Sequence, residues 1–132
     1  KLLHIHIDLQ ADHCRAEPTL LLRAIDNLYS NAVHYGAESG NIWIRSRQQG
    51  SRVVIEVANT GTPIPAAERA MIFEPFFQGN LQRKGAVKGS GLGLSIAKDC
   101  LRRLQGDLQL IDSVDADVCF RIELNTTAGT LS

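Results

Sequence analysis

Alternation of apolar and polar residues near the start of the chain predicts a β-strand. In "HIHIDL" (residues 4–9), Ile5, Ile7 and Leu9 fall on one side and polar residues fall on the other. Such period-two alternation is typical of a strand with one face in water. We therefore expect a half-buried strand with these apolar side chains facing the core. Four more segments have strand-like patterns, in two pairs: 41–47 with 52–59, joined by a turn around Gly50, and 107–112 with 117–124, with Val118, Phe120, Ile122 and Leu124 inward.

Two segments follow the helical period instead. The first extends from about residue 18 to about residue 35, because Pro18 suits a first helical position and Gly36 ends the pattern. The second extends from about residue 91 to about residue 104. Helices on one face of a mostly antiparallel sheet accommodate all these elements, which indicates an α+β fold. The apolar stripe of the first helix, expected to face the core, consists of Leu21, Ile25, Leu28 and Ala32.

The composition indicates one soluble domain without a strongly charged partner. The chain has 132 residues, with 14 Lys and Arg against 14 Asp and Glu, and a net charge of zero disfavours nucleic acid or a membrane surface. No apolar run approaches the roughly 20 residues that span a bilayer, and no signal peptide is recognised. We expect a domain over 1–125 and a flexible tail over 126–132. Three cysteines in no metal-binding spacing are expected to be buried, reduced thiols: Cys14, Cys100 and Cys119.

Two asparagines occupy one face of the first predicted helix. Asn27 and Asn31 are four residues apart, so their side chains stack, and His34 lies close to them. Asparagine is a poor helix-interior residue, because its side chain competes for backbone hydrogen bonds. The pair is either a polar surface or a source of amide oxygens for Mg²⁺, which also takes ligands from phosphates.

A glycine-rich turn precedes the second predicted helix. "GSGLGLS" (89–95) has glycine at every other position of its first half and matches neither a Walker A motif nor a dinucleotide fingerprint. Tight packing would explain the glycines, but such a turn also exposes backbone N–H groups to a phosphate at a helix N-terminus. The stretch before it (61–89) combines glycines, prolines and basic residues around "MIFEPFF", which favours a lid over a disordered insert. Together with the asparagine pair, these features make phosphate binding the preferred interpretation.

Four motifs in this order resemble a known family. "NLYSNAVHYG", "NTGTPIP", "IFEPFF" and "GSGLGLSIA" resemble the N, G1, F and G2 boxes of the catalytic ATP-binding domain of sensor histidine kinases. The lid and tail are similar to those of one enterobacterial subgroup. The resemblance implies ATP and Mg²⁺ as ligands. It also implies the Bergerat ATP-binding fold, a two-layer sandwich with about three helices on a mixed, mostly antiparallel sheet of about five strands.

The resemblance also implies roles for individual residues. Asn31 would coordinate Mg²⁺ with Asn27 beside it, and His34 would reach a phosphate, so these three are the catalytic candidates. Phe73 and Phe77 would join a third phenylalanine in anchoring the lid. The expected ATP-binding residues are Asn27, Asn31, His34, Tyr35, Asn59, Gly61, Ile64, Phe76, Arg83, Lys84, Lys88, Gly89, Ser90, Gly91, Leu92, Gly93 and Leu94.

Three positions depart from the family pattern. The family's adenine-reading aspartate is Asn59 here, and the second glycine of the G1 box is Pro63. A neutral amide oxygen makes a weaker hydrogen bond to the adenine amino group than a carboxylate does, so the sequence predicts tighter binding for Asn59→Asp. The arginine that often follows the F box is Gln78, so the lid is expected to supply positive charge instead.

The expected reaction is phosphotransfer rather than hydrolysis. ATP hydrolases of this superfamily carry a glutamate at the position of Asn27, and an asparagine cannot accept a proton at neutral pH. The γ-phosphate would therefore pass to a histidine on a separate dimerisation domain of a homodimer, with a response regulator downstream. We expect a cytoplasmic domain of a bacterial inner-membrane sensor, with no nucleic acid partner and no direct membrane contact. Two alternatives stay open: a nucleotide-binding regulatory module with weak or no kinase activity, and a serine kinase that acts on anti-sigma-factor antagonists.

Overall fold

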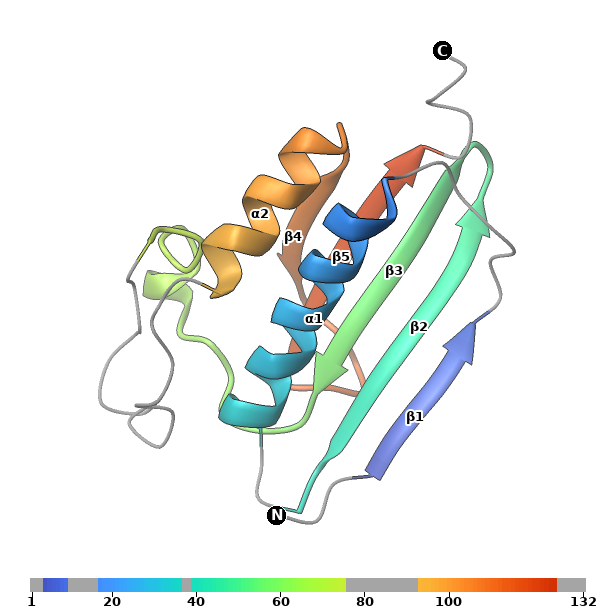
Figure 1. Ribbon diagram of the computed structural model, residues 1–132. Coiled ribbons are helices and arrows are strands. Elements are labelled where there is room, and N and C mark those ends of the chain that lie inside the picture. The colour runs from blue at the N-terminus through green and yellow to red at the C-terminus, as the bar shows by residue number, and fades with distance from the viewer. Residues whose placement is uncertain (1–3, 10–16, 37–38, 76–92, 126–132) are drawn as a thin grey trace.

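Five strands form one sheet in the order β1-β2-β3-β5-β4 (Figure 1). β1 runs parallel to β2, and the other neighbouring pairs are antiparallel. The expected mixed sheet is confirmed, as is the turn at Gly50, whose φ of 60° favours glycine. The computed structural model describes residues 4–9, 17–36, 39–75 and 93–125, in which the strands are β1 His4–Leu9, β2 Asn41–Gln49, β3 Arg52–Asn59, β4 Asp107–Ile111 and β5 Val118–Asn125.

Both α-helices lie on the same face of the sheet (Figure 1). Helix α1 (Pro18–Tyr35) packs over β3, and helix α2 (Gly93–Arg103) packs over β4 and against α1. The α+β class is confirmed, but the described part of the chain has two α-helices and one short 3-10 helix, η1 (Ala66–Glu68), where about three helices were expected. Within that part, no helix is long and apolar enough to cross a membrane.

Helix α1 begins and ends where the sequence predicts. Pro18 occupies the first turn, and the Glu17 carboxylate accepts hydrogen bonds from two backbone N–H groups of that turn. At the other end, a methyl group on Gly36 would lie 2.5 Å from the carbonyl oxygen of Ala32 and 3.3 Å from that of Thr60. Glycine therefore lets the end of α1 approach the loop that follows β3.

The core lies between the helices and the sheet. On α1, the fully buried side chains are Ala24, Leu28 and Ala32, whereas Leu21 and Ile25 are only partly buried. The predicted stripe thus lies on the correct side of the helix but omits Ala24, which is fully buried. The inward face of β5 is buried as expected, and its members are Val118, Phe120, Ile122 and Leu124.

The expected half-burial of β1 is wrong. Ile5 and Ile7 are 45% and 63% exposed. β1 is an edge strand, and α1 packs over β3, so neither described helix covers β1. Alternation identifies the apolar face of a strand, but it does not reveal whether another element covers that face. The side chain of Leu9, the third residue expected to face the core, lies outside the described atoms.

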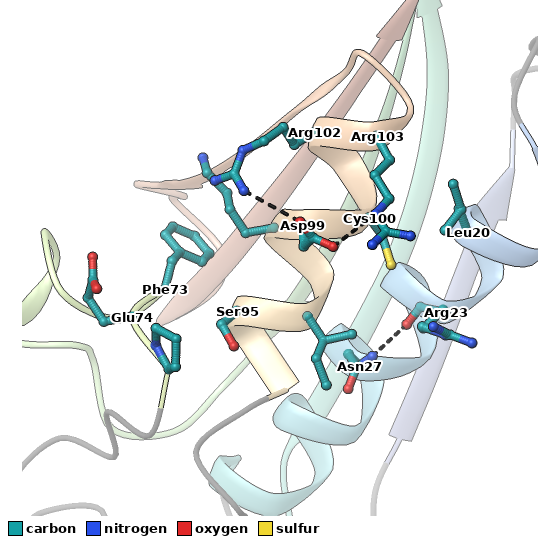
Figure 2. Close-up of a pocket in the computed structure, with 13 residues that line it drawn as sticks. Leu20, Arg23, Asn27, Phe73, Glu74, Ser95, Asp99, Cys100, Arg102 and Arg103 are labelled. Atoms are coloured by element: carbon teal, nitrogen blue, oxygen red, sulfur yellow. Dashed lines mark hydrogen bonds and ion pairs between the residues drawn. The ribbon is translucent and has the colours of Figure 1, made fainter.

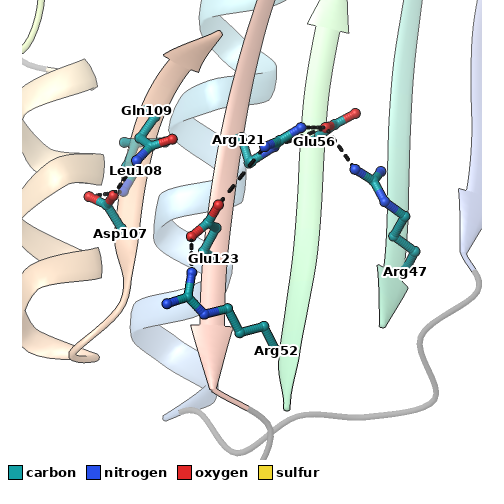
Figure 3. A network of polar contacts seen from close by, with 8 residues as sticks. All are labelled: Arg47, Arg52, Glu56, Asp107, Leu108, Gln109, Arg121 and Glu123. Atoms are coloured by element: carbon teal, nitrogen blue, oxygen red, sulfur yellow. Dashed lines mark hydrogen bonds and ion pairs between the residues drawn. The ribbon is translucent and has the colours of Figure 1, made fainter. Parts of the chain in front are cut away.

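The face of the sheet opposite the helices carries a chain of ion pairs (Figure 3). Arg121 donates two hydrogen bonds of 3.1 Å to one oxygen of Glu56, and Arg47 approaches the same oxygen at 3.5 Å. Arg121 also lies 3.9 Å from Glu123, which pairs with Arg52 at 2.7 Å. Because Glu56 is only 5% exposed, these two guanidinium groups compensate for the desolvation of its charge.

Two of the three cysteines are buried free thiols, as expected: Cys100 and Cys119. Burial, with a smaller contribution from the charge of Glu56, raises the pKa of the Cys119 thiol to about 11. This thiol therefore stays protonated and unreactive at neutral pH. Cys14 lies outside the described residues, as does the expected tail over 126–132.

Candidate functional site

Helix α1 carries the predicted polar face along the border between core and solvent. Asn27 and Asn31 are partly exposed, while the adjacent Leu28 and Ala32 are buried. His34 follows on the exposed side, near the end of the helix. Both asparagines thus border the core and remain accessible to a ligand.

The side-chain amide of Asn27 has a defined orientation. Its Nδ2 donates a hydrogen bond of 2.8 Å to the carbonyl oxygen of Arg23, so its Oδ1 points the other way, toward the start of α2 (Figure 2). A methyl group placed on Gly93, the first residue of α2, would lie 3.3 Å from that oxygen. The N-terminus of α2, the positive end of its helix dipole, therefore lies beside an acceptor oxygen of α1. The next residue, Leu94, packs against the core.

The loop after β3 meets the C-terminal end of α1. Gly36 and Gly61 form an isolated antiparallel bridge. Asn59 is 2% exposed, and its Nδ2 donates a hydrogen bond of 2.8 Å to the carbonyl oxygen of Thr60, so its amide oxygen is the atom that can accept from a ligand. Ile64 is 5% exposed and belongs to the core. Helix α1 thus contacts both of the other segments that the sequence predicted to share its site: the start of α2 beside Asn27, and the loop after β3 beside Gly36.

The other predicted residues lie away from these contacts, are described only in part, or fall outside the described ranges. Tyr35 is described through its backbone alone, as the last residue of α1. Phe73 packs edge-on against Phe120, with ring centroids 6.1 Å apart, and the Lys98 ammonium lies 5.0 Å from its ring. This phenylalanine is therefore fixed to the body of the domain. The predicted residues outside the described ranges are Phe76, Phe77, Arg83, Lys84, Lys88, Gly89, Ser90, Gly91 and Leu92.

A groove of about 730 Å³ has Asn27 in its lining (Figure 2). Inside it, Asp99 pairs with Arg102 at 3.5 Å and with Arg103 at 3.1 Å, so two guanidinium groups of α2 share one carboxylate of the same helix. Its lining comes from both helices and the segment 73–75, and comprises Leu20, Arg23, Asn27, Phe73, Glu74, Pro75, Ser95, Ile96, Lys98, Asp99, Cys100, Arg102 and Arg103.

Sequence reasoning missed one residue that contacts the site. The backbone N–H of Gly61 donates a hydrogen bond of 2.9 Å to Asp117 Oδ2, although the two residues are 56 positions apart. No local motif marks Asp117. The antiparallel pairing of β3 with β5, which places Asn59 opposite Val118, is the signal that would have brought it next to the loop.

Residues 16–128 match the model of the histidine kinase-, DNA gyrase B- and HSP90-like ATPase family. The chain belongs to this family. The match includes α1 and the two segments that contact it, the loop after β3 and the start of α2. The family predicted from the four motifs is therefore confirmed.

The most informative relatives are sensor histidine kinases. The chain is 68% identical over 130 residues to sensor histidine kinase GlrK of Escherichia coli (strain K12) and to sensor histidine kinase QseE of Escherichia coli O157:H7, covering 98% of this chain and 27% of each relative. The chain thus spans about a quarter of their length. This similarity confirms the expected resemblance to an enterobacterial subgroup.

Solved structures give the same result. A nucleotide-free catalytic domain of histidine kinase ThkA superposes with a TM-score of 0.79 at 27% identity, covering 94% of this chain and 79% of that one. ThkA in complex with response regulator protein TrrA matches with a TM-score of 0.76 at 25% identity, covering 96% of this chain and 35% of that one. The domain is therefore of the histidine kinase catalytic type.

We expect Gly93→Ala to weaken ATP binding by about tenfold, since displacing a binding group by even 1 Å can reduce activity by about a hundredfold. The added methyl would press on the Asn27 amide oxygen at 3.3 Å. Stability should not fall, because alanine is a better helix former than glycine by about 1 kcal/mol. Titration calorimetry and thermal unfolding measure the two effects separately. Ile96→Ala, on the exposed side of the same turn, is the control that should bind normally; equal affinity in both variants would contradict the prediction.

Proposed function

We propose that this chain binds Mg·ATP and presents its γ-phosphate to a histidine side chain of a separate phosphoacceptor domain. The observation that carries this proposal is the approach of the Asn27 amide oxygen to Gly93 at the start of α2. A magnesium–phosphate group needs oxygen ligands for the metal and N–H donors for the phosphate. At this junction, α1 supplies an amide oxygen for the metal and the start of α2 supplies N–H donors for the phosphate.

The metal end of the site belongs to α1. Asn31 is the proposed Mg²⁺ ligand, with Asn27 beside it, because amide oxygens are hard donors and both residues border the core. Magnesium, when bound, neutralises the negative charge that develops on the phosphates. His34, exposed near the end of the helix, would contact a phosphate in its protonated form. The remaining proposed phosphate ligands are Arg83, Lys84, Lys88, Gly89, Ser90, Gly91, Leu92, Gly93 and Leu94, with Phe76 at the base of the lid.

The purine end belongs to the loop after β3. Asn59 Oδ1 would accept a hydrogen bond from the adenine amino group, because Nδ2 is already bonded to Thr60. Gly61 has no side chain to block the base, and Ile64 provides apolar surface beneath it. Tyr35 precedes Gly36, which is bridged to this loop, so its proposed place is at the adenine or ribose.

The residue at the position of Asn27 favours transfer over hydrolysis. An amide cannot take a proton from water at neutral pH, and the amide nitrogen of Asn27 is already bonded to the backbone of α1. The chain's own residues would therefore bind and orient the nucleotide, while another domain would bring the nucleophile. The complex of ThkA with TrrA supports a response regulator as the next partner. We place the domain on the cytoplasmic side of a homodimeric sensor.

Asn59 also supports a second candidate, a nucleotide-binding regulatory module with weak or no kinase activity. A neutral hydrogen bond contributes about 0.5–1.5 kcal/mol, against about 1.5–3 for one to a charged group. Titration calorimetry with ATP, with and without Mg²⁺, distinguishes the candidates. Magnesium-dependent binding, followed by transfer of labelled phosphate to the histidine domain of the full-length protein, supports the kinase. No binding at millimolar ATP contradicts the kinase, and binding without transfer favours the regulatory module.

A further inference from the structure

The loop after β3 has a backbone conformation that needs external support. Gly61 has a φ of 152°, a region that is essentially restricted to glycine. Glycine also has the largest conformational freedom to lose on folding, so it does not hold this geometry by itself. Contacts from other parts of the chain must therefore fix the loop if it is to bind a planar ligand.

Asp117 supplies two such contacts from the loop that precedes β5, the strand next to β3. Its backbone N–H donates a hydrogen bond of 3.0 Å to the carbonyl oxygen of Asn59, and its carboxylate accepts one of 2.9 Å from the N–H of Gly61. One residue therefore holds both ends of the turn formed by residues 59–61. Asp117 is itself held in place, because it immediately precedes β5 and the next residue, Val118, pairs with Asn59 in the sheet.

We propose that Asp117 is a positioning residue for the purine end of the nucleotide site. This inference rests on the proposed function, in which Asn59 and Gly61 face the base. The carboxylate acts through the loop and not on the nucleotide itself: by accepting the Gly61 N–H it keeps the turn open in the geometry that the base requires. Asp117 is exposed, so its side chain contributes little to the core, and its removal should affect the loop far more than the fold.

The substitutions that test this role are Asp117→Ala, which removes the acceptor, and Asp117→Asn, which retains an acceptor oxygen without the charge. Asp115→Ala is the matched control. Asp115 lies in the same loop, but its carboxylate contacts Ser113 and Arg45, which lower the pKa of its carboxyl, whereas the Gly61 N–H is bonded to Asp117. The control therefore removes the same side chain and charge without touching the β3 loop.

The affinities for Mg·ATP and Mg·ADP are measured by calorimetry. We expect Asp117→Ala to weaken both by the same factor, about fivefold, which corresponds to one ordinary hydrogen bond. Asp117→Asn and Asp115→Ala should stay within about twofold of the original chain, because each keeps an acceptor for the Gly61 N–H. An equal loss for the two nucleotides excludes the terminal phosphate, the only group in which they differ, as the origin of the effect. Hydrogen exchange of the Gly61 amide should be faster in Asp117→Ala alone.

Each other outcome overturns the inference in an identifiable way. If the original chain binds nucleotide and Asp117→Ala binds it equally well, Asp117 has no positioning role and the proposed function stands. If Asp115→Ala loses as much nucleotide affinity as Asp117→Ala, the effect is general loosening of the loop. The same conclusion holds if Asp117→Asn also loses affinity and its melting temperature falls. If the original chain binds neither nucleotide, the proposed function fails, and the Asp117 role fails with it.

Discussion

We expect Asn31→Ala to abolish the Mg²⁺-dependent part of ATP binding. Substitution of residues that merely orient metal ligands typically lowers metal affinity by about 10–100-fold, so removing a ligand should lower nucleotide affinity by about a hundredfold or more. The fold should persist, because the adjacent Leu28 and Ala32 carry the buried contacts of this part of α1. Alanine is also the better helix former. Calorimetry at several Mg²⁺ concentrations and circular dichroism measure the two effects.

Two further variants make the Asn31 result specific. Asn31→Asp keeps an oxygen ligand and should retain binding that still depends on Mg²⁺. Ser30→Ala, at the exposed neighbouring position, changes the helix without changing the asparagine face and should bind ATP normally. If Asn31→Ala keeps both its affinity and its Mg²⁺ dependence, the metal is held elsewhere and the assignment of α1 as the metal end is wrong.

Local signals predicted most of the secondary structure. Pro18 and Gly36 bracket α1 because each acts on the residues next to it, so the bounds of this helix could be read from the sequence. The exposure of β1 could not be predicted from the sequence, because it depends on which strand α1 covers. Packing between distant elements decides this. The buried position of Ala24 also depends on the angle at which α1 meets the sheet.

The candidate site also combines features that local motifs predict with features that depend on tertiary structure. Motifs on single elements identified Asn27, Asn59 and Gly93, because each lies in a short, recognisable segment. The contact between Asp117 and Gly61 joins residues on opposite sides of the β3–β5 pairing, so only the register of the sheet reveals it. The orientation of each amide also depends on tertiary structure, since it is set by the backbone carbonyl that the amide nitrogen finds.

The orientation of the Asn59 amide adds a cost in stability to the prediction of tighter adenine binding for Asn59→Asp. From the sequence alone, the added charge should strengthen the hydrogen bond to adenine. In the structure, Nδ2 donates to the carbonyl oxygen of Thr60 at 2.8 Å, and the residue is only 2% exposed. A carboxylate would place an acceptor against that carbonyl oxygen and bury an unpaired charge. We therefore expect the free energy of unfolding of the nucleotide-free chain to fall by about 2–4 kcal/mol at neutral pH, since an unsatisfied buried group costs about 1–3 kcal/mol and a charged one more.

This loss should depend on pH in a definite direction. Burial without a donor raises the pKa of the new carboxyl above its value in the unfolded chain, about 3.9. The folded variant therefore binds more protons than the unfolded one between those two pKa values, and its stability relative to the original chain falls as the pH rises through that window. Below the unfolded pKa the penalty disappears, because a protonated carboxyl can donate to the Thr60 carbonyl as the amide does.

Urea unfolding of the original chain and of Asn59→Asp, at neutral pH and near pH 4.5, measures the loss and its pH dependence. Asn41→Asp is the matched control, because the Asn41 Oδ1 lies 2.9 Å from His6 Nε2 and a carboxylate can take over this contact. That control should change the free energy of unfolding by less than about 1 kcal/mol. If Asn59→Asp is as stable as the original chain at neutral pH, the Asn59 nitrogen has no structural role. Tighter adenine binding, as the sequence alone predicts, would then be the expected result.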